Sequence, residues 1–346
     1  MENFFIEYRD PMFGLIILFS AIFIISFVNY WWGAFKSKEE KHGIEQFIKK
    51  FEIVSDEDEY KKLLKDHAIP VESLALLAHA YTKSGDFEKA IGLYLIILER
   101  TKEKKKKEFI LSELGKTYFK AGFLRRSADI FLESLRLHPR NAESLKFLSV
   151  TYEKLKEFDK AIEVLDSLEE LGAKVTNQRS YLKALSIIYN YQLSDTQKVK
   201  EIKKLLEKAP FLQRKYFEFL KRINKKIEIK ELDTFDLHAL IDLLWYEDLS
   251  FIDLRESKSV LVQEILSAKD LAAEVEVFEY FEFEVLAKLK KAGFTKASLN
   301  FEYICDECKH TFPIHFDRCP NCHSIASVKI QPIISKENHE ENISFL

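Results

Sequence analysis

A chain of 346 residues is long enough for about two domains with a sizeable buried core. Its composition is 47% hydrophobic and 32% charged with only 9 glycines and 7 prolines, which excludes a collagen-like or disordered protein and favours a helix-rich one. The net charge of −3, from 53 Lys and Arg against 56 Asp and Glu, excludes the broad basic field that drives non-specific nucleic-acid binding. Any recognition must therefore depend on local surfaces.

Residues 12–32 form an uncharged apolar run, and about 20 such residues in a helix cross the hydrocarbon core of a bilayer. A cleaved signal peptide is disfavoured, because acidic residues precede the run and bulky Tyr30, Trp31 and Trp32 end it. Lysines are frequent just after the run, whereas Arg9 is the only basic residue before it. By the positive-inside rule we expect a single-pass transmembrane helix with residues 1–11 outside the cytoplasm and the bulk of the chain inside it.

A charged helical linker is expected over residues 33–69, and the sequence then repeats itself. The segments 73–94, 111–131 and 145–165 align without internal gaps, and the second and third are offset by 34 residues. An aligned tyrosine is followed nine positions later by a small residue in each segment, in the pairs Tyr81 and Ala90, Tyr118 and Ser127, and Tyr152 and Ala161. This is the pattern of tetratricopeptide repeats, in which two antiparallel helices cross closely at the small residue. We assign residues 70–173 to these repeats.

The turn inside each repeat is often marked by glycine. Gly85 and Gly122 occupy that turn in the first two repeats, whereas Lys156 stands there in the third, which puts the local geometry of the third repeat in question.

Residues 174–298 keep a helical period but lose the consensus residues, so we expect degenerate helical repeats that continue the solenoid. The predicted fold is all-α: a tetratricopeptide-type solenoid with one transmembrane helix at its N-terminus and a small metal-binding ribbon at its C-terminus.

A solenoid of this kind presents a long concave face to extended peptides or to other proteins. By resemblance to tetratricopeptide grooves, eight residues on the first helices of the repeats are expected to face the partner: His79, Lys83, Lys116, Phe119, Lys120, Lys146, Val150 and Lys154. The five lysines among them suggest an acidic ligand, although solvated lysines on a helix face are an equally common outcome. The aromatic and leucine positions at helical spacing are interpreted as core rather than as a cofactor site.

All four cysteines lie close together, as two C-x2-C pairs separated by ten residues: Cys305, Cys308, Cys319 and Cys322. Paired thiolates of this spacing form a tetrahedral four-sulfur site for one zinc ion, or for iron, and they imply a reducing compartment. Zinc is favoured as a structural ion, and metal binding is expected to supply folding energy that about 30 residues cannot get from a core. The nearby His310, His315 and His323 are surplus to a complete sulfur set and are expected at the surface.

We assign residues 299–335 to this rubredoxin-like knuckle and residues 336–346 to a disordered tail. Rubredoxin knuckles often carry glycine after the second cysteine of each pair, to allow a left-handed backbone. Lys309 and His323 stand at those positions, which puts the knuckle geometry and any tuned redox role in question.

An N-terminal anchor, tetratricopeptide repeats and a terminal rubredoxin-like knuckle, in this order, resemble the bacterial lipopolysaccharide assembly protein B family (LapB, also called YciM). The likeness is carried by residues 113–131, by residues 152–172, and by the ten-residue gap between cysteine pairs followed by CPNC. The resemblance implies a non-enzymatic inner-membrane adaptor that brings the lipid A pathway deacetylase to the membrane-bound AAA+ protease FtsH, with the knuckle packed against the repeats. It implies the four cysteines as metal ligands and no catalytic residue.

Rival functions remain. The sequence contains no GxxxxGK[ST], GxSxG, HExxH or GxGxxG motif, so an enzyme is disfavoured. An electron carrier of the rubredoxin type would need iron in the knuckle. A nucleic-acid-binding ribbon is disfavoured because near the knuckles Lys309, Arg318 and Lys329 are matched by Asp306, Glu307 and Asp317. The main alternative is a membrane-anchored repeat scaffold for another envelope or secretion assembly.

Overall fold

The structure is a computed structural model, and it describes residues 18–28, 30–31, 70–247, 252–271 and 275–336. The predicted linker and the predicted C-terminal tail lie outside these residues, apart from Lys336. The predicted membrane helix lies partly outside them: its described residues are helical and exposed. None of the helices formed by the described residues has both the length and the apolar character that a membrane crossing requires.

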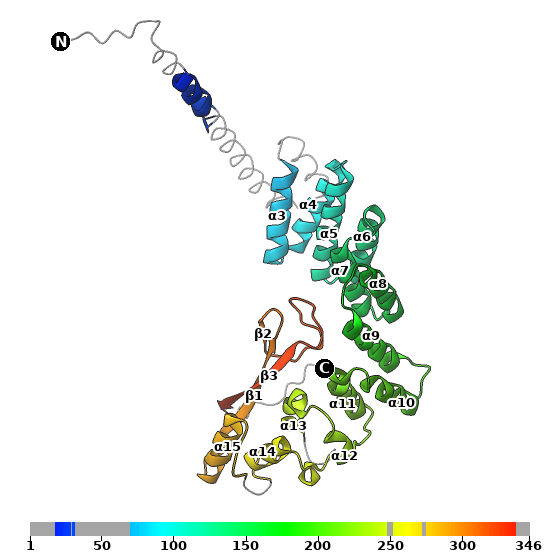
Figure 1. The fold of residues 1–346 in the computed structure, drawn as a ribbon, viewed down its shortest axis with the longest axis vertical. Helices are drawn as coiled ribbons and strands as arrows, with labels where there is room; N and C mark the ends of the chain where they lie inside the picture. The colour runs from blue at the N-terminus through cyan, green and yellow to red at the C-terminus, as the bar shows by residue number, and fades with distance from the viewer. Residues whose placement is uncertain (1–17, 29, 32–69, 248–251, 272–274, 337–346) are drawn as a thin grey trace, which may run out of the picture. The chain divides into compact units, whose positions relative to one another are not determined.

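The chain divides into two compact units, Met1–Phe147 and Leu148–Leu346. The first unit contains two helical hairpins (Figure 1). The hairpins are formed by α3 (Val71–Ser84) with α4 (Phe87–Arg100), and by α5 (Lys104–Lys120) with α6 (Leu124–Leu137). Helix α7 (Ala142–Lys154) begins in the first unit and ends in the second.

The second hairpin shows why a small residue is needed where the helices cross. A Cβ atom added to Gly115 would lie 2.7 Å from the ring of Phe131, so only glycine allows this approach. The hydroxyl of the fully buried Ser127 donates to the Gly115 carbonyl at 2.9 Å. Ala90 and Ala161, the equivalents of Ser127, are also fully buried. The small positions predicted from the repeat alignment are therefore buried in all three repeats.

The turn of the third repeat keeps the left-handed backbone without glycine. Gly85 and Gly122 have φ of 88° and 82°, and Lys156 has φ of 61°. A side chain in this region raises the energy by about 1–2 kcal/mol. The Glu157 amide nevertheless donates to the Tyr152 carbonyl at 2.9 Å, and the equivalent hydrogen bond is present in the other two repeats. Lysine in place of glycine at this turn therefore leaves the repeat geometry unchanged.

The second unit begins with regular helices and becomes irregular. Helices α8 (Phe158–Glu170), α9 (Thr176–Tyr189) and α10 (Asp195–Leu206) have the lengths expected of repeats. Shorter helices follow: η1 (Pro210–Leu212), α11 (Gln213–Arg222), α12 (Ile229–Leu232), η2 (Leu237–Leu240), α13 (Ile241–Tyr246), η3 (Leu254–Glu256), α14 (Val260–Ala268) and α15 (Phe281–Lys291). Only part of the region predicted as degenerate repeats therefore has repeat-like helices, although every regular element described between its start and Lys296 is a helix.

A three-stranded antiparallel sheet in the order β2-β1-β3 closes the unit (Figure 1). Its strands are β1 (Ala297–Cys305), β2 (Thr311–Phe312) and β3 (Val328–Lys336). Alternate residues of β1, from Leu299 through Phe301 to Tyr303, are buried and belong to the same core as helix residues such as Leu244 and Phe283. The ribbon therefore shares the core of the helices, so burial of one face of β1 contributes to its stability in addition to the metal binding expected from the sequence.

Candidate metal centre and repeat surface

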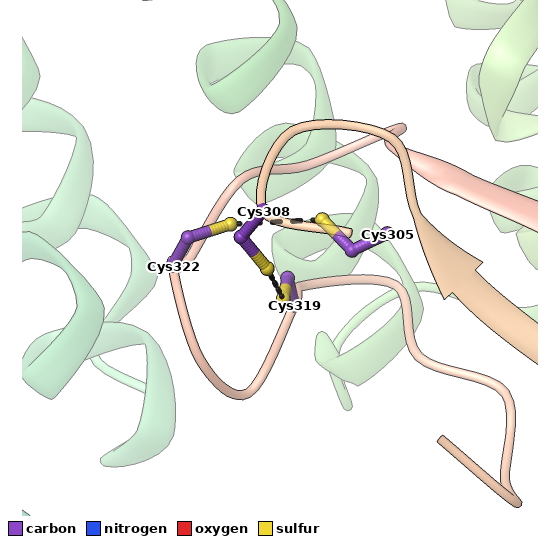
Figure 2. A group of neighbouring side chains, drawn as sticks. All are labelled: Cys305, Cys308, Cys319 and Cys322. Carbon is purple, nitrogen blue, oxygen red and sulfur yellow. Dashed lines mark hydrogen bonds between the residues drawn. The ribbon is translucent and has the colours of Figure 1, made fainter. Parts of the chain in front are cut away.

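The four cysteines converge on one point (Figure 2). Their sulfurs all lie within 4.8 Å of one another, and two contacts join the two knuckles: Cys305 to Cys322 and Cys308 to Cys319, each at 3.6 Å. A tetrahedral zinc ion with bonds of about 2.3 Å places its sulfurs roughly 3.8 Å apart. The four thiols thus fit a zinc ion, and the same cage would also hold iron.

The two knuckles have the same backbone geometry. Lys309 and His323 adopt φ of 58° and 62°, the left-handed conformation that glycine usually supplies here. The Lys309 amide donates to the Cys305 carbonyl at 2.8 Å, and the His323 amide donates to the Cys319 carbonyl at 3.0 Å. Both knuckles are therefore formed without glycine, and the geometric doubt raised by the sequence does not hold.

Two serines that the sequence analysis did not single out complete the site. The Ser324 and Ser327 hydroxyls lie 3.5 and 3.4 Å from the Cys305 sulfur, and Ser324 also lies 3.0 Å from the Cys322 sulfur. Burial by itself raises the pKa of the Cys305 thiol, but backbone N–H groups of Cys308 and Glu307 and these two hydroxyls outweigh burial and lower the pKa to about 5. Thiolates are the form that binds metal, so the surroundings of Cys305 favour the ion, whereas burial raises the pKa of the Cys319 thiol to about 12.

The three histidines near the knuckles do not behave alike. Among the described residues, the cluster suited to a metal contains the four cysteines and no histidine. His310 is exposed, as expected. His315 is half-buried: its ring packs edge-on against Tyr303 with centroids 5.4 Å apart, and its Nε2 is buried with no hydrogen-bond partner among the described residues. Burial lowers the pKa of His315 to about 4, so its ring is neutral near pH 7.

The second knuckle is tied to helices of its own unit by charged pairs. The Arg318 guanidinium donates to both carboxylate oxygens of Glu153 on α7 and, at 2.6 Å, to the His323 carbonyl within the knuckle. Only 9% of the Arg318 side chain and 11% of the Glu153 side chain are exposed. The neighbouring residue, Asp317, forms an ion pair with Lys215 on α11 at 2.5 Å. Arg318 and Asp317 thus position the knuckle on the helices rather than facing solvent.

A buried polar cluster ties β1 to α11 and α13. Arg214 donates to both oxygens of Asp242 at 2.6 and 2.8 Å, and the Tyr303 hydroxyl donates to the same carboxylate at 2.8 Å. All three residues are less than a tenth exposed. Burial by itself raises the pKa of Asp242, but its bonds to Arg214 and Tyr303 outweigh burial, and the net shift is downward. No sequence motif marks this cluster, since its members are 28 and 61 residues apart.

The predicted groove residues fall into two groups. His79, Lys83, Lys120, Lys146 and Lys154 are exposed, whereas Phe119 and Val150 are 9% and 4% exposed and belong to the core. Lys116 is largely covered and forms ion pairs with Glu113 and Glu143, both at 2.6 Å. The exposed lysines stay candidates for contact with an acidic partner, while Phe119 and Val150 offer little surface to one.

In the first unit these lysines lie close enough to affect one another. Burial first, and then the positive charge of Lys83, lower the pKa of Lys120.

An apolar cavity of about 660 Å³ opens between α3 and α5, and its lining includes Leu76 and Phe109, which are 72% and 57% exposed. This cavity was not predicted from the sequence. Both helices carry large apolar residues outside their buried face, and that pattern could have indicated an exposed apolar surface.

Comparison with protein families identifies the repeats. Residues 73–108 and residues 112–175 match two family models described as tetratricopeptide repeat. These segments are tetratricopeptide repeats. The matches cover the hairpins α3–α4 and α5–α6, the helix pair α7–α8, and the start of the segment beyond them.

Individual relatives are distant. The "Protein CTR9 homolog" of Arabidopsis thaliana is 34% identical over 100 residues, which are 28% of this chain and 9% of that protein. Two MamA structures, a double mutant from RS-1 and one from AMB-1, are 16% identical with TM-scores of 0.34 and 0.31. They cover 58% and 57% of this chain, with 97% and 96% of their own lengths matched. A tetratricopeptide protein of Thermus thermophilus is 20% identical with a TM-score of 0.28, over 53% of this chain and 98% of its own.

Proposed function

We propose that this protein is a membrane-anchored adaptor that binds other proteins through its tetratricopeptide repeats. The observation that carries the proposal is the helix pair α3 and α5, which carries the exposed Lys83 and Lys120 and borders an apolar cavity lined by Leu76 and Phe109. Such a combination suits a peptide or protein segment that offers acidic and apolar side chains. We propose no catalytic role, because tetratricopeptide repeats are typically scaffolds and the sequence contains no GxxxxGK[ST], GxSxG, HExxH or GxGxxG motif.

The anchor is the run of residues 12–32. Within it, the side chains of residues 18–28 are exposed around the whole helix, and they include Leu18, Phe19 and Phe23 at 55%, 67% and 69%. A helix that is apolar on every side needs an apolar environment, and lipid supplies one. Together with the lysines that follow the run, this supports a bacterial inner membrane location with the repeats on the cytoplasmic side.

The specific role we propose is regulation of lipopolysaccharide synthesis, by bringing the lipid A pathway deacetylase to the protease FtsH. Support comes from the resemblance to the lipopolysaccharide assembly protein B family, from the repeats, and from a cysteine knuckle placed after them. The alternative is a scaffold for another envelope or secretion assembly, which would use the same anchor and the same repeats.

Depletion of the protein in its native cell distinguishes the role in lipopolysaccharide regulation from a general scaffold role. If the adaptor role is right, the deacetylase accumulates and lipopolysaccharide output rises as the protein disappears. A chain lacking residues 1–32 is expected to restore neither to its normal level, whereas a chain with Cys305→Ser and Cys319→Ser tests whether the knuckle is needed. Unchanged deacetylase and lipopolysaccharide after depletion would make the general scaffold the better interpretation.

A further inference from the structure

The four thiols of the metal centre form two pairs, each with one buried and one accessible member. Cys305 and Cys319 are fully buried, Cys308 is partly exposed and Cys322 is exposed. Two sulfur contacts, each of 3.6 Å, join a buried thiol of one knuckle to an accessible thiol of the other (Figure 2).

This arrangement suits stepwise oxidation. An accessible thiolate is the group that a dissolved oxidant reaches first, and a neighbouring thiolate within contact distance can then form a disulfide with it. We propose that the metal centre is an oxidation site, at which a peroxide-class oxidant forms two disulfides across the knuckles, Cys305–Cys322 and Cys308–Cys319. The inference goes beyond the adaptor role and does not depend on it.

The chemistry balances within each pair. The Cys322 thiolate attacks the peroxide, so that an S–O bond forms, the O–O bond breaks and hydroxide leaves. The Cys305 thiolate then attacks the Cys322 sulfur, so that the S–S bond forms, the S–O bond breaks and a second hydroxide leaves. Two thiolates lose two electrons, and the peroxide gains them. Cys308 and Cys319 react in the same way with a second peroxide, and the metal loses all four ligands.

The pairing has a structural consequence. Disulfides across the knuckles keep the two turns joined after the metal leaves, whereas disulfides inside each C-x2-C unit would leave the turns unconnected. Cross-knuckle pairing therefore retains Arg318 near Glu153 on α7, and a thiol reductant can restore the metal-binding thiols without refolding the ribbon.

The test uses the full chain, purified in detergent and loaded with zinc. Hydrogen peroxide is added, released zinc is followed with a chromogenic chelator, and the protein is digested with trypsin without reduction. Trypsin separates the two knuckles, because it cuts after Lys296, Lys309, Arg318 and Lys329. Cross-knuckle disulfides join peptide 297–309 to peptide 319–329, whereas disulfides within a knuckle leave them apart.

A second digestion that cuts after Glu307 separates Cys305 from Cys308, and fragmentation between Cys319 and Cys322 completes the assignment. We expect about two equivalents of peroxide to release the zinc and to give the two pairs named above, reversibly with dithiothreitol. In Cys322→Ser, Cys308 and Cys319 still join while Cys305 remains a thiol. Zinc removed by a chelator under reducing conditions is the control, and it leaves all thiols free.

Three results would overturn the proposal. They are disulfides within the C-x2-C units, zinc that stays bound until sulfonic acids appear, and pairing of Cys305 with Cys319. Each can be read from the wild-type protein, so the proposal stays testable even if Cys322→Ser fails to fold.

Discussion

Asp242 is the residue whose loss we expect to weaken the second unit most, because it neutralises a buried guanidinium. Arg214 is 7% exposed and directs two hydrogen bonds at the Asp242 carboxylate. In Asp242→Asn the shape is kept but the charge is lost, which leaves Arg214 with Glu218 at 3.2 Å and the Ala239 carbonyl at 3.1 Å. Breaking a buried ion pair from one side lowers stability by about 3–5 kcal/mol. We expect the lower end, about 3 kcal/mol, because Glu218 remains.

Two matched variants separate charge from packing. Tyr303→Phe removes one hydrogen bond to the same carboxylate and leaves the ion pair intact, so we expect a loss of about 1.5 kcal/mol. Arg214→Met with Asp242→Leu removes both charges together and is expected to lose less stability than Asp242→Asn alone, since no uncompensated charge stays buried.

The assay is urea unfolding of the zinc-loaded full chain in detergent, followed by the fluorescence of Trp245. This tryptophan is 7% exposed, stacks on Phe283 with centroids 5.9 Å apart, and lies three residues after Asp242. Replacing Trp31 and Trp32 with Phe leaves Trp245 as the single reporter. If Asp242→Asn loses no more stability than Tyr303→Phe, the reasoning about the buried charge is refuted.

Three further predictions follow from single sites. Cys305→Ser with Cys319→Ser is expected to abolish binding of one zinc per chain, measured by elemental analysis, and full zinc content would contradict the four-sulfur assignment. At the left-handed Lys156, the glycine variant is expected to be about 1 kcal/mol more stable than the alanine variant in urea unfolding; equal stability would contradict the backbone argument. The pKa of His315 is about 4 in the folded chain and about 6.5 in the unfolded chain, so the unfolded chain binds the proton first as the pH falls. The free energy of unfolding therefore decreases as the pH drops through this window, by at most about 3 kcal/mol. The decline between pH 7 and 5 should be shallower in His315→Phe, and an unchanged slope would rule this out.

Local patterns predicted the local parts of the fold. Tyrosines followed nine positions later by small residues located the helical hairpins, and Ala90, Ser127 and Ala161 are buried where the alignment required. The cysteine spacing predicted the metal site because its ligands come from two short turns, each set by four consecutive residues. In both cases the interacting residues are close in the chain, so their spacing carries the geometry.

Contacts between distant segments were not predictable. The bonds of Arg318 to Glu153 and of Tyr303 to Asp242 join residues 165 and 61 positions apart, and no motif relates them. The same limit explains why the half-buried position of His315 was not predicted, since it depends on the approach of Tyr303, 12 residues away. It also explains why the ribbon was expected to depend on metal: the core that it shares with the helices is formed by residues on both sides of the ribbon boundary.

The central claim is that this chain brings proteins together at a membrane without transforming them, and reconstitution tests it most directly. The measurement is the rate at which the purified deacetylase is degraded by FtsH in lipid vesicles, with and without the full chain. The adaptor account predicts faster degradation with the full chain, and a smaller effect when residues 1–32 are missing or when Lys83 and Lys120 are changed to Glu. A degradation rate that is the same with and without the full chain would contradict the account.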